Sequence, residues 1–300
     1  MSIEVKNLTK IYGEQKAVNN ISFSLNKGEI VGFLGPNGAG KSTTMKIITG
    51  FLKADAGNVK VSGIDVNEDP ITVKKKVGYL PEANPLYYDM YIKEYLEFIA
   101  GVHKIQNSKS KIQSVIELTG LTVEQKKKIG QLSKGYKQRV GLAASLIHDP
   151  EVLILDEPTS GLDPNQIIEI RNVIKQQGQN KTVLFSSHIL QEVEAICDRV
   201  IIINKGVLVA DDKLANLRKG DTAIVVSVSF KEALEAEWLN RLPAAMRAEK
   251  IDANSWKITT DDAEALRKQI LELALQHNLN IVSLQTESQS LEDVFRQLTK

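Results

Sequence analysis

Residues 35–43 read Gly35-Pro36-Asn37-Gly38-Ala39-Gly40-Lys41-Ser42-Thr43, which fits the pattern GxxxxGK[ST] of a phosphate-binding loop. The residues before it, Glu29–Leu34, predict a short buried strand, and Thr43–Ile48 predict the start of a helix. A strand, a glycine-rich loop and a helix in this order are the context that the motif requires. The glycines allow successive backbone N–H groups to turn inward on an anion at the helix N-terminus.

The loop therefore predicts a site for a nucleoside triphosphate. Lys41 is expected to bridge the β- and γ-phosphates, and the Ser42 hydroxyl to bind Mg²⁺. The residues expected to surround the phosphates are Gly35, Pro36, Asn37, Gly38, Ala39, Gly40, Lys41, Ser42 and Thr43. The motif by itself leaves one alternative open, a glycine-rich turn without a ligand.

Two carboxylates follow a second buried strand, Glu151–Leu155. In open α/β sheets the carboxyl ends of the strands face the ligand crevice, and packing alone rarely ends a buried strand in two acids. We expect Asp156 to hold the hydration shell of Mg²⁺ and Glu157 to orient or deprotonate the attacking water.

Three further side chains are candidates whose position also allows a structural role. Tyr12, expected in a loop over Lys10–Gly13, offers a flat face for an adenine ring or is a turn tyrosine. Ser133 precedes an apolar helix, where it serves an anion site or only caps the helix. His188, after the strand Thr182–Ser186, reaches a γ-phosphate or is a structural histidine.

Composition fits a globular chain of one large domain or two. The 300 residues are 42% hydrophobic and 25% charged, and 38 basic against 37 acidic residues leave a net charge of +1. A net charge this small creates no overall electrostatic field that would indicate binding to nucleic acid or to anionic lipid. Cys197 is the lone cysteine, which excludes an internal disulfide and fits a reducing compartment. We find no secretory signal and no apolar run long enough to span a membrane.

The pattern of strands and helices predicts an α/β fold. Alternating segments near residues 3–8, 21–25 and 58–61 predict an antiparallel sheet, and the buried strands that alternate with helices predict a largely parallel one. Helical spacing over 93–119, and a capping box at Thr122–Gln125 that opens another short helix, predict a helical insertion over about 86–148.

The last part of the chain, residues 221–300, predicts a second domain. Its order of strands at 223–230, 247–251, 256–260 and 281–286 and helices at 231–241 and 262–276 is the ferredoxin-like βαββαβ pattern, followed by a terminal helix. Metal spacing, a nucleophile arrangement and a phosphate loop are all missing from its sequence. A regulatory or dimer-supporting role and a simple stabilising role both remain open.

Over residues 1–218 the chain resembles the ATP-binding subunit of an ABC transporter. The matching elements come in the family's order: Tyr12 in the aromatic loop, Gly35–Ser42 in Walker A, Glu82 in the Q-loop, Ser133–Arg139 in the signature, Asp156 and Glu157 in Walker B, Ser160–Asp163 in the D-loop, and His188 in the switch. The resemblance implies that Ser133 and Gly135 contact a γ-phosphate. It places Asp163 beside the nucleotide and gives Glu82 an oxygen for Mg²⁺ or water.

Two departures from the family pattern lie where they bear on the rate of hydrolysis. Glu82 stands where the Q-loop usually has glutamine, which adds a charge near the phosphates. The signature, usually Leu-Ser-Gly-Gly-Gln, reads Leu132-Ser133-Lys134-Gly135-Tyr136. Its serine and second glycine are intact, so the resemblance still implies competence to close.

The resemblance implies a head-to-tail homodimer around two ATP molecules with Mg²⁺, associated peripherally with the cytoplasmic face of the cell membrane through a separate transmembrane permease. The ending Leu291–Phe295 is similar to that of ABC-2 type exporter subunits. Within that group, Pro81–Tyr87 and Ser133–Leu142 are most similar to the gliding-motility ATP-binding subunit.

The alternative to a transporter subunit is a soluble ABC ATPase acting on nucleic acid or the ribosome. The single nucleotide domain and the lack of a basic arm favour the transporter, with no nucleic-acid partner.

Overall fold

The protein is described by a computed structural model that covers residues 1–219, 224–287 and 291–299. The chain divides into two compact units, Met1–Leu214 and Ala215–Gln297. In the described residues, no helix is both long and apolar enough to cross a bilayer.

The first unit contains an antiparallel sheet in the order β2-β1-β4-β5. Its strands are β1 (Ile3–Tyr12), β2 (Gln15–Leu25), β4 (Ala56–Val61) and β5 (Ile64–Asp65). The prediction of three such strands was right in place but too short for β1 and β2. The expected loop at Lys10–Gly13 is the end of β1 and the start of a tight turn, in which Tyr12 pairs with Gln15 across the hairpin.

A second, six-stranded sheet has the order β10-β9-β3-β8-β7-β6 and is parallel except for β10. Its strands are β3 (Ile30–Leu34), β6 (Val77–Leu80), β7 (Val152–Leu155), β8 (Thr182–Ser187), β9 (Arg199–Asn204) and β10 (Val207–Lys213). Strands β7 and β8 are buried along their whole length, as parallel strands covered on both faces must be. The largely parallel sheet that the sequence predicts is therefore present.

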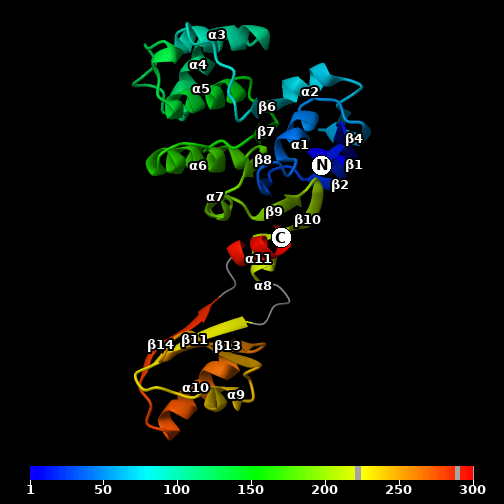
Figure 1. Cartoon of the computed structure of the whole chain (residues 1–300). Coiled ribbons are helices and arrows are strands. Elements are labelled where there is room, and N and C mark those ends of the chain that lie inside the picture. The colour runs from blue at the N-terminus through cyan, green and yellow to red at the C-terminus, as the bar shows by residue number, and fades with distance from the viewer. Residues whose placement is uncertain (220–223, 288–290, 300) are drawn as a thin grey trace. The chain divides into compact units, whose positions relative to one another are not determined.

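Helices flank both sheets (Figure 1). They are α1 (Lys41–Ile48), α2 (Pro70–Lys76), α6 (Pro164–Gly178) and α7 (Leu190–Ile196). Helix α8 (Leu214–Lys219) begins at the last residue of the first unit, and its other residues belong to the second unit. Helix α6 begins where the sequence dictates. The Asp163 carboxylate accepts a hydrogen bond from Gln166 N at 3.0 Å, and Pro164 occupies the first turn.

The helical insertion consists of α3 (Ile92–Val102), α4 (Ser108–Leu118), the 3₁₀ turn η1 (Ile129–Gln131) and α5 (Lys134–Leu146), and the three α-helices pack on one another. The helix expected to begin at Thr122–Gln125 does not form. That segment is a run of turns, because its backbone bonds span three residues, as from Glu124 N to Leu121 O and from Lys127 N to Glu124 O.

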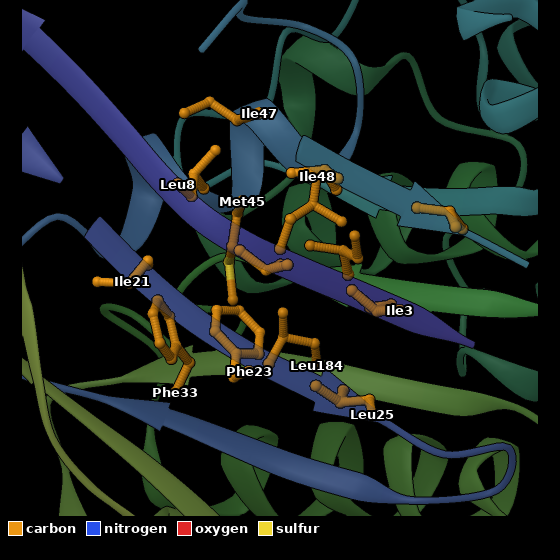
Figure 2. Close-up of a cluster of buried hydrophobic side chains, with 14 of the residues drawn as sticks. Ile3, Leu8, Ile21, Phe23, Leu25, Phe33, Met45, Ile47, Ile48 and Leu184 are labelled. Carbon is orange, nitrogen blue, oxygen red and sulfur yellow. The ribbon is translucent and has the colours of Figure 1, made fainter. Parts of the chain in front are cut away.

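The core between the sheets holds α1 in place. Met45 of α1 is fully buried and points toward Phe23 of β2, while Ile47 and Ile48 pack beside the strands (Figure 2). Because α1 begins at Lys41, this packing also fixes the glycine loop that precedes it.

The second unit has its own core and a four-stranded antiparallel sheet in the order β12-β13-β11-β14. Its elements are β11 (Ile224–Phe230), α9 (Ala236–Asn240), β12 (Arg247–Lys250), β13 (Ser255–Thr260), α10 (Ala263–Gln276) and β14 (Ile281–Glu287), followed by α11 (Leu291–Thr299). The βαββαβ order is as predicted. The sequence segment 221–223, at the start of the expected domain, lies outside the described residues.

Helix α9 is much shorter than the helix expected over 231–241. The residues before it are tied to the start of β14 instead. Lys231 N donates to Asn280 O at 2.8 Å, and the Glu232 carboxylate accepts from Asn280 N and Nδ2 at 2.8 and 2.7 Å. Those bonds hold the chain in an extended connection, so the helix starts only at Ala236.

Candidate functional site

The glycine loop lies between β3 and α1, the arrangement expected of a phosphate-binding loop. Gly38 and Gly40 have φ of 77° and 109°, a left-handed region that side chains with a Cβ rarely adopt. Gly35 is required for a different reason, since a Cβ there would collide with the Ile203 carbonyl. Ala39 is buried, and Asn37 and Gly38 are exposed at the tip of the loop. The N-terminus of α1 is thus open to an anion.

Lys41 is a buried cation held by acceptors of its own loop. Its Nζ donates to Gly35 O at 2.8 Å and to Pro36 O at 3.3 Å, and it lies 3.5 Å from Glu157 Oε1. The Lys41 side chain is 6% exposed. A cation this buried needs acceptors, and a phosphate entering the loop would compete for its three donors.

Asp156 and Glu157 follow β7 at the carboxyl end of the parallel sheet. Asp156 is buried, and one of its oxygens accepts from Ser186 Oγ at 2.7 Å. Ser186 Oγ also accepts from Glu157 N at 2.9 Å. The Glu157 backbone has φ of 49°, a left-handed conformation that costs free energy in a residue with a side chain.

His188, after β8, is a second contact of the Glu157 carboxylate. Its Nδ1 lies 2.8 Å from Glu157 Oε2, while the other oxygen of the same carboxylate faces Lys41. The His188 side chain is 47% exposed, so its far edge is open to solvent. The ends of β3, β7 and β8 therefore bring Lys41, Asp156, Glu157 and His188 together, although they lie far apart in the sequence.

A cleft of about 790 Å³ adjoins this cluster. Ser42, Glu82 and Asp156 are among the residues that line it, together with residues of α1, β6, the segment after β6, α3 and α5. Tyr79 lies in the same wall, and its buried hydroxyl has no hydrogen-bond partner among the described residues. Burial, together with the nearby Asp156 carboxylate, raises the pKa of the Tyr79 hydroxyl well above its usual value.

The signature residues stand apart from that cluster and lie against α6. Ser133 caps α5 by accepting from Tyr136 N at 3.4 Å. Gly135 packs so closely on Gln166 that a Cβ would collide with its amide, and Lys134 lies against Gly161. Asp163 is exposed beside them as the cap of α6.

Tyr12 is also separate, at the tip of the β1–β2 hairpin. Its ring is 51% exposed, and Lys10 Nζ lies 5.6 Å from the ring centroid.

The sequence interpretation missed several buried polar residues behind the site. Ser186 joins Asp156 to Glu157, as described above. Thr159 Oγ1 and Ser187 Oγ both donate to Glu192 Oε2, at 2.7 and 2.8 Å. Serines and threonines are common in any chain, so only the sequence position at the end of a buried strand could have singled out Ser186 and Ser187.

Comparisons with known proteins show the family to which the chain belongs. A family model described as "ABC transporter" matches residues 18–160, and one described as "ATP-binding protein DrrA1-3-like, C-terminal domain" matches residues 213–299. The linearmycin resistance ATP-binding protein LnrL of Bacillus subtilis is 35% identical, with 99% of this chain and 98% of the relative aligned. The chain belongs to the ABC transporter ATP-binding proteins. Its C-terminal unit is of the DrrA-like, ABC-2 exporter type.

Other ABC relatives agree. The bacitracin transport ATP-binding protein BcrA of Bacillus licheniformis is 33% identical, with 99% of this chain and 96% of the relative aligned. A dimeric ATP-binding cassette solved in a post-hydrolysis state, bound to ADP and Pi, is 26% identical and superposes with a TM-score of 0.66 over 71% of this chain and 98% of that one. This ABC protein therefore has the P-loop fold of the family, binds ATP and is an ATPase.

Proposed function

We propose that this ABC ATPase works as a head-to-tail homodimer around two ATP molecules and drives a separate transmembrane permease, for export. The observation that carries the proposal is the cluster in which the Glu157 carboxylate contacts Lys41 on one oxygen and His188 on the other. The dimeric cassette that was solved with ADP and Pi supports the dimer. The separation of Ser133 from the glycine loop within one chain also supports the dimer. A signature that lies against α6 can contact the nucleotide bound by a second copy.

The same cluster suggests the role of each residue. The loop residues Gly35–Thr43 hold the phosphates, and Lys41 exchanges its carbonyl acceptors for phosphate oxygens. Glu157 is then released from Lys41 to accept a proton from the attacking water. His188 holds the Glu157 carboxylate through Nδ1 and leaves its exposed edge for the γ-phosphate. In the dimer, Ser133 and Gly135 of one chain contact the γ-phosphate in the other chain's loop, with Asp163 beside it.

The residues of the cleft fit a magnesium ion. Asp156 is a buried carboxylate whose observed donor is the neutral Ser186 hydroxyl, so it has acceptor capacity to spare, and Ser42 and Glu82 share the same wall. Mg²⁺ prefers such oxygen ligands and neutralises charge that develops on phosphate. Tyr12 is proposed to stack on the adenine.

The cleft also suits the permease. Its lining includes apolar and aromatic side chains of the helical insertion, among them Tyr95, Ile99 and Val102. A short amphipathic helix on a cytoplasmic loop of a membrane protein matches such a groove in size and chemistry. Docking there would hold this ATPase at the cytoplasmic face of the membrane and transmit motion from the Glu82 segment.

Two more specific export functions are each supported by a different observation. The printed names of the relatives, linearmycin resistance and bacitracin transport, support an antibiotic or a similar small molecule as cargo. The segments Pro81–Tyr87 and Ser133–Leu142 support a gliding-motility exporter instead. Cargo analysis of the purified complex separates these two.

The proposal is tested by purifying the tagged protein from detergent-solubilised native membranes, identifying the chains that co-purify and assaying ATPase activity on the same eluate. A multi-span membrane protein is expected. A Val102→Glu variant should lose it, because Val102 lines the cleft and is 63% exposed, whereas Val123→Glu, at an 84% exposed position in the turns after α4, should retain it. Recovery of ribosomes or DNA-bound proteins without a permease would instead establish the alternative, a soluble ABC ATPase.

A further inference from the structure

We propose that the helical insertion binds anionic lipid headgroups directly, through a surface of tyrosine rings and lysine ammonium groups. This surface, which we call the tyrosine–lysine surface, consists of Tyr88, Tyr91, Lys126, Lys128 and Lys137. The contact needs neither ATP nor a permease. It is a second attachment to the membrane, beside the cleft in which the permease is proposed to dock.

Formal charge is distributed unevenly along the chain. Residues 86–148, the helical insertion, hold ten basic and five acidic residues, whereas the rest of the chain holds 28 basic and 32 acidic residues. The near-neutral total therefore combines a basic insertion with an acidic remainder. Because α3, α4 and α5 gather at one end of the first unit (Figure 1), the excess positive charge lies at that end. A local positive charge attracts an anionic partner even when the whole molecule is almost neutral.

Backbone pairing brings the two halves of the surface together. The segment that leads to α3 and the segment that leads to η1 lie side by side. Gly130 N donates to Tyr88 O at 2.8 Å, and Tyr91 and Lys128 form an antiparallel bridge. The tyrosines of one segment and the lysines of the other are therefore presented on a fixed backbone.

Each of the two tyrosine rings has a lysine ammonium group near it. Lys128 Nζ lies 5.8 Å from the centroid of the Tyr91 ring, and Lys137 Nζ lies 5.0 Å from the centroid of the Tyr88 ring. Both tyrosines are exposed. The surface thus offers aromatic carbon and positive charge at the same level.

The acidic residues nearest to the surface in the sequence are Asp89, Glu94 and Glu124. Glu124 is paired with Lys127, which is not part of the surface, at 2.6 Å. The Glu94 carboxylate accepts from Tyr91 N at 3.1 Å at the start of α3, where the helix dipole offsets part of its charge. Asp89 lies between the two tyrosines and opposes three lysines. A net positive charge therefore remains.

Lipid headgroups fit this chemistry better than a protein partner. The core of a protein interface is depleted of charged residues, lysine among them. Here the ammonium groups lie beside the rings themselves, so burying the rings in a protein interface would bury the charges with them. Tyrosine is enriched in the headgroup layer of membranes, and lysine ammonium groups are attracted to the phosphates of anionic lipids.

The first experiment is flotation of the purified full chain, without nucleotide, with two kinds of vesicle. One kind is phosphatidylcholine alone, and the other is phosphatidylcholine mixed with phosphatidylglycerol in equal parts. Binding is expected to the mixed vesicles and not to the neutral ones, and added salt should weaken it.

Two double variants test the lysines. Lys126→Gln combined with Lys128→Gln should bind the mixed vesicles about 25-fold more weakly, because each lysine near an anionic surface contributes about a factor of five. Lys53→Gln combined with Lys60→Gln, which removes two exposed lysines outside the insertion, should bind like the wild type. A wild type that does not bind the mixed vesicles, or equal binding by the first double variant, would overturn the proposal.

The second experiment locates the contact. Tyr91→Trp places an indole in the tyrosine–lysine surface, and its emission should be quenched by mixed vesicles that contain brominated lipid. Tyr12→Trp, at the tip of the β1–β2 hairpin, should be quenched no more than the wild type. The native Trp238 and Trp256 lie in the C-terminal unit, so the wild type is the blank. Equal quenching in both variants would contradict the proposed surface.

Failure of this proposal and failure of the proposed function are distinguishable. The variant with Lys126→Gln and Lys128→Gln should retain wild-type ATPase activity in detergent solution, because neither lysine is proposed to bind the nucleotide. Its loss of vesicle binding while the permease still co-purifies would support the lipid contact. A surface that binds a co-expressed permease but no vesicle would assign it to a protein partner, which overturns the lipid contact and leaves the proposed function intact.

Discussion

Glu157 is the residue on which most of the site's geometry converges. Its carboxylate is fixed from two sides by Lys41 and His188, and its backbone is held in a left-handed conformation by the hydrogen bond from its N–H to Ser186. Strained backbone persists only where the surroundings enforce it. The backbone after β7 therefore directs the Glu157 carboxylate toward the glycine loop that begins at Gly35.

Glu157→Gln should bind ATP but lose at least about 100-fold in turnover, because an amide cannot accept the proton of the attacking water. The variant should accumulate as a dimer in ATP. Phosphate release and size-exclusion chromatography measure the two effects, with Glu68→Gln, an exposed carboxylate, as control. Normal turnover in Glu157→Gln would remove Glu157 from the role of base.

His148 predicts a pH dependence of stability. Burial, together with the stacked ring of His103 at 4.0 Å and the charge of Lys181, lowers the pKa of His148 from 6.5 to about 4, against smaller opposing effects of the hydrogen bond to Val77 O and of Asp149. Its Nε2 lies 3.1 Å from Val77 O. The unfolded chain binds the proton first, so the free energy of unfolding should fall as pH drops from about 6.5 to about 4, by up to roughly 3 kcal/mol.

Denaturant titrations across this pH range measure that slope. His148→Phe keeps an aromatic ring against His103 but cannot be protonated, and its unfolding free energy should depend less on pH. His277→Gln, which replaces an exposed histidine, should retain the wild-type slope. The same slope in His148→Phe as in the wild type would assign the pH dependence to other groups.

At the residue scale, the sequence predicted the charged and titratable residues of the cluster but not the serine that connects two of them. Lys41, Asp156, Glu157 and His188 belong to patterns of residue type at a fixed place after a strand, and the structure brings them together. Ser186 has no such pattern, because a serine is informative only once the neighbouring strand is known. The catalytic and binding roles themselves remain predictions.

At the scale of the element, α5 combines two properties at the residue that caps its N-terminus. Ser133 is its N-cap, and the same hydroxyl is proposed to contact the partner's γ-phosphate. Capping and catalysis can be separated, since a carboxylate also caps a helix but cannot donate to phosphate and repels it.

Ser133→Ala should therefore cost about 1 kcal/mol of stability and also reduce ATP turnover. Ser133→Asp should retain the stability and still lose turnover, by about 100-fold or more, as expected when a transition-state donor is removed. Thermal unfolding and ATPase assays on both variants give the answer. If Ser133→Asp hydrolyses ATP normally, Ser133 is a cap and nothing more.

The elements were predictable where periodicity or buried strands marked them, as in α3, α4, β7 and β8. Predictions were wrong where tertiary bonds override the local pattern. Residues 122–125 have a capping-box sequence but form turns, and residues 231–235 are bound to Asn280 and leave α9 short. A single sequence shows the local preference and not the distant partner that competes with it.

At the scale of the whole molecule, two units with separate cores predict two unfolding events. All the residues proposed to bind the nucleotide lie in Met1–Leu214. Saturating MgADP should raise the stability of that unit by about 2.7 kcal/mol at one hundred times its dissociation constant and leave the other unit unchanged.

Calorimetry with and without MgADP checks this expectation, and Lys41→Ala, which removes the proposed phosphate ligand, is the control that should abolish the shift. A single transition that moves as a whole would mean that the two units unfold cooperatively.

The distribution of tryptophan has a spectroscopic consequence. Trp238 and Trp256 are the chain's two tryptophans, and both lie in the C-terminal unit, the second of them fully buried in its core. Intrinsic tryptophan emission therefore reports on that unit alone. A change in emission on adding nucleotide would be a direct optical signal that the event at the phosphate loop is communicated to the C-terminal unit, obtained without attaching any label.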